Sequence, residues 1–476
     1  MKDLLVMKFG GTSMGSADRI EVAGKLAREA LAQRPVAVVV SAMSKVTDLL
    51  LDTLRRAEGG DNAAVEANLK TLAERHEAAC GKLLDGAALD QAVGEVETLV
   101  AEFRRIANGV QMLGERPPRA VDEAVAVGER LSAMMLTAYL SRHGVRAKAI
   151  NAREVIVTDA VFGNATPLMD KTRERAQRLL RPLIEDGMLP VVTGFNGATA
   201  DGRPTTLGRG GSDFSASILA AALDSSELWI WTDVDGIMTA DPRIVPGAAV
   251  LAEVTYREAA ELAYNGAKVL HPRTLAPLVE RKIPVWSKNS FAPERPGTRI
   301  VPEVKAPPGP RAVTSMAGVA LVSLEPNSAE VSGTRIMGRA LEALSATSAE
   351  VLAMTSSSYQ QSFCFLVRKD ELERAREAVE AALSLEINHE YIKPVEVNEN
   401  VGLLAVVGEG MRGKAGMAGE IFTAISREKV NVIAIAQGSS ELTIAIVVAR
   451  EGLDKAVRAV HQQCRMGETA GYTGIK

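Results

Sequence analysis

Residues 4–13 read LLVMKFGGTS, an apolar run that contains one lysine and closes on two glycines. A continuous apolar run, unlike an alternating one, is typical of a strand buried on both faces of a parallel sheet. The stretch ADRIEVAGKLAREALAQ at 17–33 follows it and has helical spacing. Gly10 and Gly11 therefore mark a turn from a buried strand into a helix.

The same kind of apolar run returns before residue 300 as VAVVVSA (36–42), LPVVTGF (189–195), ELWIWTDV (227–234) and KIPVWS (282–287). Helical stretches lie between these runs, and residues 48–113 form a long, charged and mostly helical excursion. Strands that alternate with helices predict an α/β domain with an open, mainly parallel sheet sandwiched by helices.

Beyond residue 300 the organisation changes. The stretch VPEVKAPPGPR at 301–311 carries four prolines and predicts a linker. The remaining chain repeats itself at an offset of roughly 80 residues, so that GVALVSLE (318–325) resembles VGLLAVVG (401–408). Each repeat is typical of a ferredoxin-like βαββαβ module. The predicted parts are 1–300, the linker 301–311, and two modules at 312–392 and 393–476.

Composition and charge exclude several classes of function. The net charge is −4 without a long basic run, which argues against binding nucleic acid. No apolar stretch reaches the roughly 18 residues that span a bilayer, and the N-terminus does not have the pattern of a signal peptide. Cys80, Cys364 and Cys464 lack metal-ligand spacing. We expect a soluble cytoplasmic protein that does not bind a membrane or hold a metal through its own residues.

Two glycine-rich turns predict an anion site. Gly10 and Gly11 would let backbone amides approach a phosphate, with Lys8 adding a full charge. The second turn, TLGRGGSD at 206–213, places Arg209 and Asp213 before another helix. Turns that follow two strands of one parallel sheet meet at the carboxyl ends of the strands. Taken alone, the first turn is equally well explained as a tight strand–helix turn with a solvated lysine, and Asp213 as a helix cap.

Two further motifs follow. WTDVDG at 231–236 leads to Asp241-Pro242-Arg243, an acidic loop that could hold ribose hydroxyls or metal-bound water, with Arg243 meeting phosphate. The alternative is an ordinary turn rich in Asp and Gly. GAKVLHP at 266–272 is another cationic glycine turn, in which we expect His271 to pack or hydrogen-bond rather than act as a base.

Together and in this order, the motifs resemble aspartate kinases of the amino-acid kinase superfamily. The matching segments are KFGGTS (8–13), VVSAMSKVTDLL (39–50), VGE (127–129), GRGGSD (208–213), WTDVDGIMTADPR (231–243) and GAKVLHP (266–272). The tail resembles the paired ACT domains of these enzymes. The resemblance implies an amino-acid kinase fold followed by two ACT domains, and ATP- and Mg²⁺-dependent phosphorylation of the L-aspartate β-carboxylate to 4-phospho-L-aspartate. That reaction is the first step towards lysine, threonine and methionine.

The resemblance also implies roles for individual residues. Lys8 would neutralise the transferring phosphoryl group with the amides of Gly10 and Gly11, and Asp213 would orient Lys8 and the acceptor. Arg209 would pair with the substrate α-carboxylate and Glu129 with its ammonium. The other substrate contacts would be Ser41 and Thr47, and the other nucleotide contacts Thr232, Asp233, Arg243, Lys268 and Val269.

Regulation is less defined by the sequence. The resemblance implies effector contacts at Gln437 and Ser439 in the second ACT domain and at Thr355 in the first. The first repeat lacks the glutamine, so lysine, threonine or neither remains open as the effector. A strand from about 311–317 could belong to the second ACT domain. We expect a homodimer or homotetramer formed through the ACT domains, and no homoserine dehydrogenase part in this chain.

Two other interpretations remain. One is a sibling kinase that phosphorylates glutamate, N-acetylglutamate or carbamate. The other is a catalytically weak amino-acid sensor whose kinase domain supports the ACT repeats. Lys8, Arg209 and Asp213 are all present, which argues against the sensor.

Overall fold

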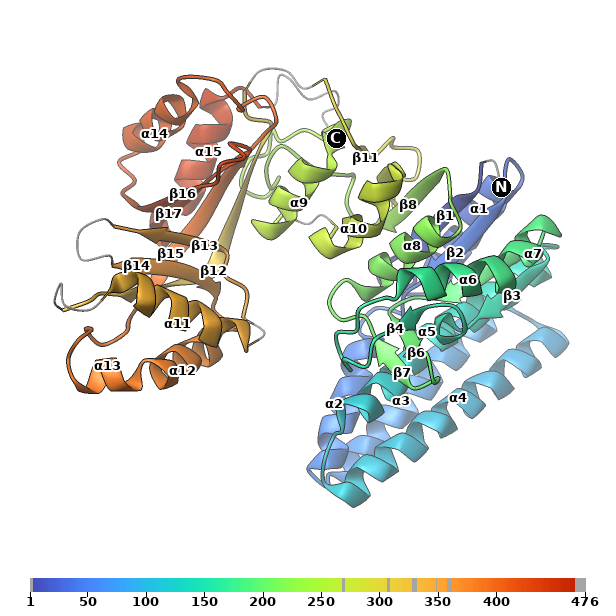
Figure 1. The fold of residues 1–476 in the computed structure, drawn as a ribbon. Helices are drawn as coiled ribbons and strands as arrows, with labels where there is room; N and C mark the ends of the chain where they lie inside the picture. The colour runs from blue at the N-terminus through green and yellow to red at the C-terminus, as the bar shows by residue number, and fades with distance from the viewer. Residues whose placement is uncertain are drawn as a thin grey trace. The chain divides into compact units, whose positions relative to one another are not determined.

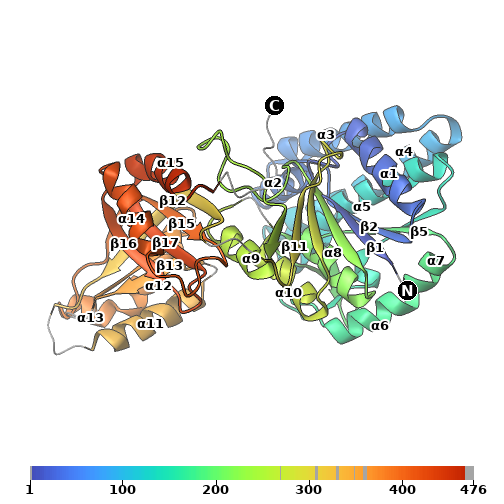
Figure 2. The same cartoon turned by 90° about the horizontal axis from the view of Figure 1, so that it is seen from above.

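The computed structural model describes residues 3–267, 270–305, 309–327, 332–347, 349–357 and 362–466. It is drawn in Figures 1 and 2. The chain divides into two compact units, which comprise 1–236 with 270–303, and 237–269 with 304–476. The boundaries at residues 300, 311 and 392 are predicted from the sequence pattern, whereas these two units are defined by their compactness. The boundaries therefore stay a prediction.

The strands that the first unit contributes to the main sheet have the order β3-β5-β2-β1-β8-β10-β11. These strands are β1 (Leu5–Phe9), β2 (Val36–Val40), β3 (Ala147–Ile150), β5 (Leu189–Thr193), β8 (Glu227–Thr232), β10 (Val285–Asn289) and β11 (Thr298–Val301). β11 is antiparallel to β10, and the other pairings are parallel. Every residue of β1 and β2 is buried, as expected for strands covered on both faces. The predicted open, mainly parallel sheet is confirmed.

Helices cover both faces of this sheet. Figure 2 shows α1, α3 and α4 on one side and α6, α8 and α10 on the other. The helices are α1 (Ala17–Leu31), α2 (Val46–Glu58), α3 (Asn62–Leu83), α4 (Gly86–Leu113), α5 (Pro118–Arg142), η1 (Ala152–Glu154), α6 (Met169–Leu179), α7 (Arg181–Glu185), α8 (Gly211–Ala222) and α10 (Pro272–Arg281). The predicted helical excursion at 48–113 corresponds to α2, α3 and α4.

A small second sheet of the first unit contains β4 (Val157–Thr158), β6 (Asn196–Thr199) and β7 (Pro204–Thr206), in that order. β7 lies against α5 and ends where the glycine-rich stretch 206–213 begins. The small sheet therefore positions the stretch 206–213 at the edge of the main sheet.

The second unit contains a separate antiparallel sheet with the order β13-β14-β12-β15-β17-β16. The helices and strands of the second unit, of which β9 is not part of this sheet, are β9 (Glu253–Thr255), α9 (Tyr256–Tyr264), β12 (Ala312–Leu324), α11 (Gly333–Ser345), β13 (Ala353–Ser356), β14 (Phe363–Arg368), α12 (Leu372–Ala382), α13 (Ser384–Asn388), β15 (Glu396–Val407), α14 (Met417–Arg427), β16 (Val432–Gln437), β17 (Thr443–Ala449), η2 (Arg450–Gly452) and α15 (Leu453–Gln463). Each repeat has the order of a ferredoxin-like module, as predicted.

The long strand β12 serves both modules. Its first part, Ala312–Met316, pairs with Leu403–Val407, whereas Val319–Leu324 pairs with Phe363–Arg368 of the first module. The strand from about 311–317 that is predicted to belong to the second module corresponds to this first part of β12. In the described part of the chain, no helix combines the length and apolar character that a bilayer crossing demands.

Candidate active site

A cavity of about 590 Å³ opens in the first unit, where β1 and β2 end and where α2 and α8 begin. It brings together seven residues that the sequence predicts, namely Lys8, Gly11, Ser41, Thr47, Glu129, Arg209 and Asp213. The cavity lies at the carboxyl ends of parallel strands, which is the usual ligand site of such a sheet. The predicted convergence of the two glycine-rich turns is therefore present in the structure.

An ion pair joins the two turns. Lys8 belongs to β1 and Asp213 to the first turn of α8, and the Lys8 Nζ lies 2.5 Å from the Asp213 Oδ1. The Lys8 side chain is 9% exposed and the Asp213 side chain 22%. The pairing holds the Lys8 side chain at the N-terminus of α8, where anions also bind.

Gly10 differs from the expected phosphate contact. Its backbone amide donates to the carbonyl of Trp231 at 3.1 Å, so this hydrogen already has a protein acceptor. A Cβ atom at Gly10 would lie 3.2 Å from the Lys8 Nζ. The glycine thus makes room for the lysine, while Gly11 lines the cavity.

Glu129 supplies a buried negative group to the cavity. It lies in α5 and is 3% exposed, and its Oε1 accepts a hydrogen bond from the Ala42 amide at 3.3 Å. Its Oε2 finds no hydrogen-bond partner among the described residues. Burial raises the pKa of this carboxyl to about 8. A ligand cation would satisfy the free oxygen and stabilise the ionised form.

The stretch 206–213 depends on glycine at two positions. Gly208 has φ +75° and Gly210 φ +69°, a region that favours glycine. Between them Arg209 is exposed and lines the cavity. His271 packs beneath Gly210 and accepts a hydrogen bond from the Arg273 amide, as expected for a packing residue.

The predicted nucleotide residues are distributed between the two units. Thr232 ends β8 and its hydroxyl donates to the exposed Asp233 at 3.3 Å, and neither residue lines the cavity. Arg243 belongs to the second unit, where it is exposed and pairs with Asp241 at 2.5 Å. Lys268 and Val269 lie outside the described residues.

Some cavity residues escape sequence reasoning. Lys45 and Phe195 line the cavity with φ +62° and +69°, and nothing in the sequence marks a lysine or phenylalanine for this strained region. Ser44 also lines it and donates to the Gly11 carbonyl at 2.9 Å, which links the loops after β1 and β2. For Ser44 and Lys45 a signal exists in their position within the matched segment 39–50, which also contains Asp48, whereas Phe195 lies outside the matched segments.

A second cavity, of about 350 Å³, lies in the second unit. Gln437 lines it together with Gly413 and Glu441, whereas Ser439 and Thr355 are not among its lining residues. The Glu441 carboxylate accepts the Gly413 amide hydrogen at 2.6 Å. Of the three predicted effector contacts, the structure therefore places one in this cavity.

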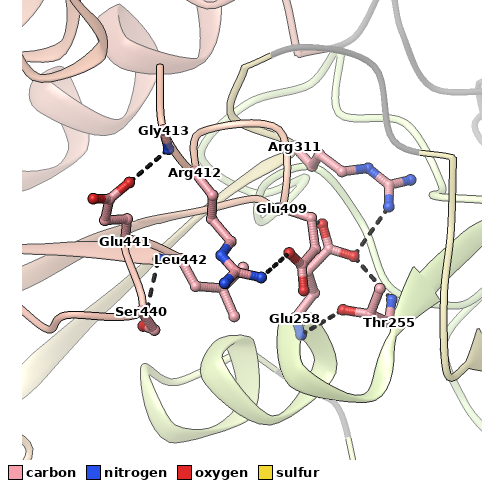
Figure 3. A network of polar contacts seen from close by, with 9 residues as sticks. All are labelled: Thr255, Glu258, Arg311, Glu409, Arg412, Gly413, Ser440, Glu441 and Leu442. Atoms are coloured by element: carbon pink, nitrogen blue, oxygen red, sulfur yellow. Dashed lines mark hydrogen bonds and ion pairs between the residues drawn. The ribbon is translucent and has the colours of Figure 1, made fainter. Parts of the chain in front are cut away.

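A polar network lies beside this second cavity (Figure 3). The buried Glu258 accepts hydrogen bonds from the Thr255 amide at 2.8 Å and, through its other oxygen, from the Glu409 amide at 3.0 Å. Arg311 pairs with the same carboxylate at 3.1 Å, and Glu409 in turn pairs with Arg412. These contacts therefore join the N-terminus of α9 to Glu409, which lies two residues before Met411, the first lining residue of the second cavity.

Comparisons with known proteins agree with this geometry. The model of the amino acid kinase family matches residues 3–289, and that of an ACT domain matches residues 404–464. A chloroplastic bifunctional aspartokinase/homoserine dehydrogenase 1 from Arabidopsis thaliana is 34% identical over 99% of this chain. The chain spans about half the length of that relative, 52%.

Solved structures are similar over nearly the whole length. Aspartokinase III of E. coli with aspartate and ADP, in the R-state, has a TM-score of 0.82 and 29% identity, covering 97% of this chain and 99% of that one. The same enzyme with lysine and aspartate, in the T-state, has a TM-score of 0.78 and 30% identity with the same coverage. The chain therefore belongs to the amino acid kinase family, and within that family it is similar to aspartokinases.

Proposed function

We propose that this protein is an aspartate kinase, which transfers the γ-phosphoryl group of ATP to the β-carboxylate of L-aspartate. One observation carries the proposal. A single cavity contains a buried carboxylate with a free oxygen at Glu129, a guanidinium at Arg209 and the Lys8–Asp213 ion pair. These groups match the ammonium and α-carboxylate of an amino acid and the charge on a phosphoryl group.

The chemistry requires little beyond this arrangement. A carboxylate is already ionised at neutral pH and attacks phosphorus without a general base, so the protein must align two anions and offset their repulsion. One oxygen of the β-carboxylate forms a bond to the γ-phosphorus, and the bond from that phosphorus to ADP breaks. Lys8 would stabilise the negative charge of the phosphoryl group during this transfer.

ATP use is supported by the ADP complex of the E. coli relative. Mg²⁺ prefers phosphate and water oxygens with one or two carboxylates, and Asp48 and Asp213 are cavity carboxylates of that kind. We propose that Mg²⁺ accompanies the ATP phosphates and offsets their charge. The nucleotide roles of Thr232, Asp233, Arg243, Lys268 and Val269 are part of the same proposal.

Regulation by an amino acid is the remaining part. The second cavity and its residue Gln437 support an effector site, and the E. coli relative binds lysine. We propose lysine or threonine as the effector and ACT-mediated assembly into a homodimer or homotetramer. The reaction would be the first step towards lysine, threonine and methionine, and would take place in the cytoplasm.

The test traps the product chemically. The purified chain is incubated with Mg-ATP and hydroxylamine and with aspartate, glutamate, N-acetylglutamate or carbamate in parallel. We expect a hydroxamate with aspartate alone. A hydroxamate with another acid would support a sibling kinase, and none with any acceptor from a folded chain would favour a sensor. Lysine and threonine are titrated in the same assay.

A further inference from the structure

Asp122 is a buried carboxylate outside the cavity lining that the proposed chemistry does not use. It lies in α5, is 2% exposed, and accepts three hydrogen bonds. The Thr206 hydroxyl donates to Oδ1 at 2.7 Å, and the amides of Thr206 and Gly163 donate to Oδ2 at 3.0 and 2.9 Å. No cation pairs with it among the described residues. An ionised carboxylate is the side chain that accepts all these bonds and donates none.

The three donors come from two segments, one at Thr206 and one at Gly163, and neither residue lines the cavity. Thr206 ends β7 and is the first residue of the stretch 206–213 that carries Arg209. Gly163 precedes Asn164, which bonds to Arg273, and Arg273 also donates to the Leu207 carbonyl. Asp122 therefore ties the base of this stretch to α5.

The same helix carries Glu129. Seven residues separate Asp122 from Glu129, which is about two turns, or about 10 Å along the axis, on the same helix face. One rigid element thus holds the substrate-facing carboxylate at one point and the origin of the Arg209 stretch at another. Arg209 itself is exposed and lies between two glycines with positive φ.

We propose that Asp122 is a positioning residue, which sets the distance between Glu129 and Arg209 and so fits the cavity to the amino and α-carboxyl groups of one amino acid. This proposal rests on the proposed function. Asp213 depends on Asp122 less, because it lies within α8, whose residues Phe214–Ala222 are buried. Loss of Asp122 should therefore disturb substrate binding more than phosphoryl transfer.

The experiment compares matched variants in the hydroxamate assay. Asp122→Ala removes all three bonds. Asp122→Asn keeps an oxygen for the two amides, and its NH₂ can donate to the Thr206 hydroxyl, which accepts as well as donates. Glu123→Ala is the control on the same helix, because Glu123 is partly exposed and its ion pair among the described residues is with Arg153 at 3.2 Å.

We expect Asp122→Ala to raise the KM for aspartate by about tenfold or more, as for a lost charged hydrogen-bond group. Its kcat and its KM for ATP should change by less than about threefold. Asp122→Asn should restore most of the affinity, and Glu123→Ala should match the wild type. In an Arg209→Ala background, Asp122→Ala should add much less to the KM, because the two residues act as one unit.

An unchanged KM in Asp122→Ala, or a lower kcat with unchanged KM, would overturn the proposal. If that variant does not fold, Thr206→Val removes the hydroxyl bond alone and should raise the KM for aspartate by about threefold. An unchanged KM there would equally reject the role. Failure of the wild type to form aspartyl hydroxamate would instead reject the proposed function, which keeps the two failures distinct.

Discussion

The ammonium nitrogen of Lys8 lies 2.5 Å from Oδ1 of Asp213, and this contact joins the end of the first strand to the start of α8. The two residues come from the two glycine-rich turns, which lie far apart in the sequence. Their pairing aims a partly buried cation into the 590 Å³ cavity that also holds Arg209 and Glu129. The contact therefore connects the phosphoryl end of the proposed reaction with the end that binds the acceptor.

Removal of the lysine should affect turnover. Lys8→Ala is expected to lower kcat by about 10²- to 10³-fold, because it removes the charge that stabilises the transferring phosphoryl group. Steady-state kinetics at saturating ATP and aspartate measure the change. Lys25→Ala is the control, since Lys25 is exposed and, in the described part of the chain, forms its ion pair with Glu21 on α1. A Lys8→Ala enzyme with nearly normal kcat would contradict the role of Lys8.

Removal of the arginine should affect binding instead. Arg209→Ala is expected to raise the KM for aspartate by about 10- to 100-fold through loss of a charged hydrogen-bonding partner, with kcat changed far less. Arg203→Ala, which breaks an exposed pair with Asp201 at 2.9 Å, should leave both constants unchanged. Equal loss of kcat and kcat/KM in Arg209→Ala would show that Arg209 acts in the transition state alone.

Aspartate binding should depend on pH through Glu129. With its pKa raised to about 8, this carboxyl is mostly protonated in the empty cavity at pH 7 and becomes ionised as the pH rises. The ammonium of aspartate stays charged over this range, so kcat/KM for aspartate should increase by up to about tenfold per pH unit between pH 6 and 8. Glu129→Gln should raise the KM and remove the dependence. A flat wild-type profile would contradict the assignment.

The stability effect of Glu129 has the opposite direction. A folded-state pKa above the unfolded value of 4.5 stabilises the protein at low pH, and this contribution is lost as the pH rises towards 8. Glu129→Gln should therefore raise Tm at pH 8 and change it less at pH 5. Equal shifts of Tm at both pH values would show that Glu129 ionises as it does in water.

The second unit should be sensitive to its buried ion pair. Arg311→Ala leaves the Glu258 carboxylate, 2% exposed, without its cation and should lower the free energy of unfolding by about 3–5 kcal/mol. Denaturant unfolding measures the loss. Arg412→Ala breaks a more exposed pair with Glu409 and should cost less than about 1 kcal/mol. A double Arg311→Met, Glu258→Gln variant should recover much of the stability, and failure to recover it would argue against an unpaired charge as the cause.

The sequence was sufficient for most of the first unit because its strands are continuous apolar runs. The run LLVMKF contains β1, which ends just before Gly10 and Gly11, and the run VAVVVSA contains β2. The convergence of Lys8, Arg209 and Asp213 could be predicted because glycine-rich turns after parallel strands meet at one edge. Ser41, Thr47 and Glu129 were indicated only by the resemblance to a known family.

Other features depend on contacts that no local pattern reveals. The segment 237–269 follows β8 in sequence, but Val245 and Ala248 pack in one core with Ile425 and Val457 of the second unit. Asp122 belongs to no sequence motif. The role proposed for it depends on hydrogen bonds to Thr206, which lies 84 residues further along the chain. Such tertiary contacts override local preference and become visible only in the folded chain.

Isotope transfer tests the central claim most directly. Aspartate labelled with ¹⁸O in both β-carboxylate oxygens is incubated with the enzyme, Mg-ATP and hydroxylamine. Hydroxylamine attacks the acyl carbon and releases phosphate, which is analysed by mass spectrometry. Carboxylate attack on the γ-phosphorus predicts one ¹⁸O in each phosphate released with hydroxamate. Phosphate without ¹⁸O would mean that water, rather than aspartate, accepts the phosphoryl group, and would contradict the proposed function.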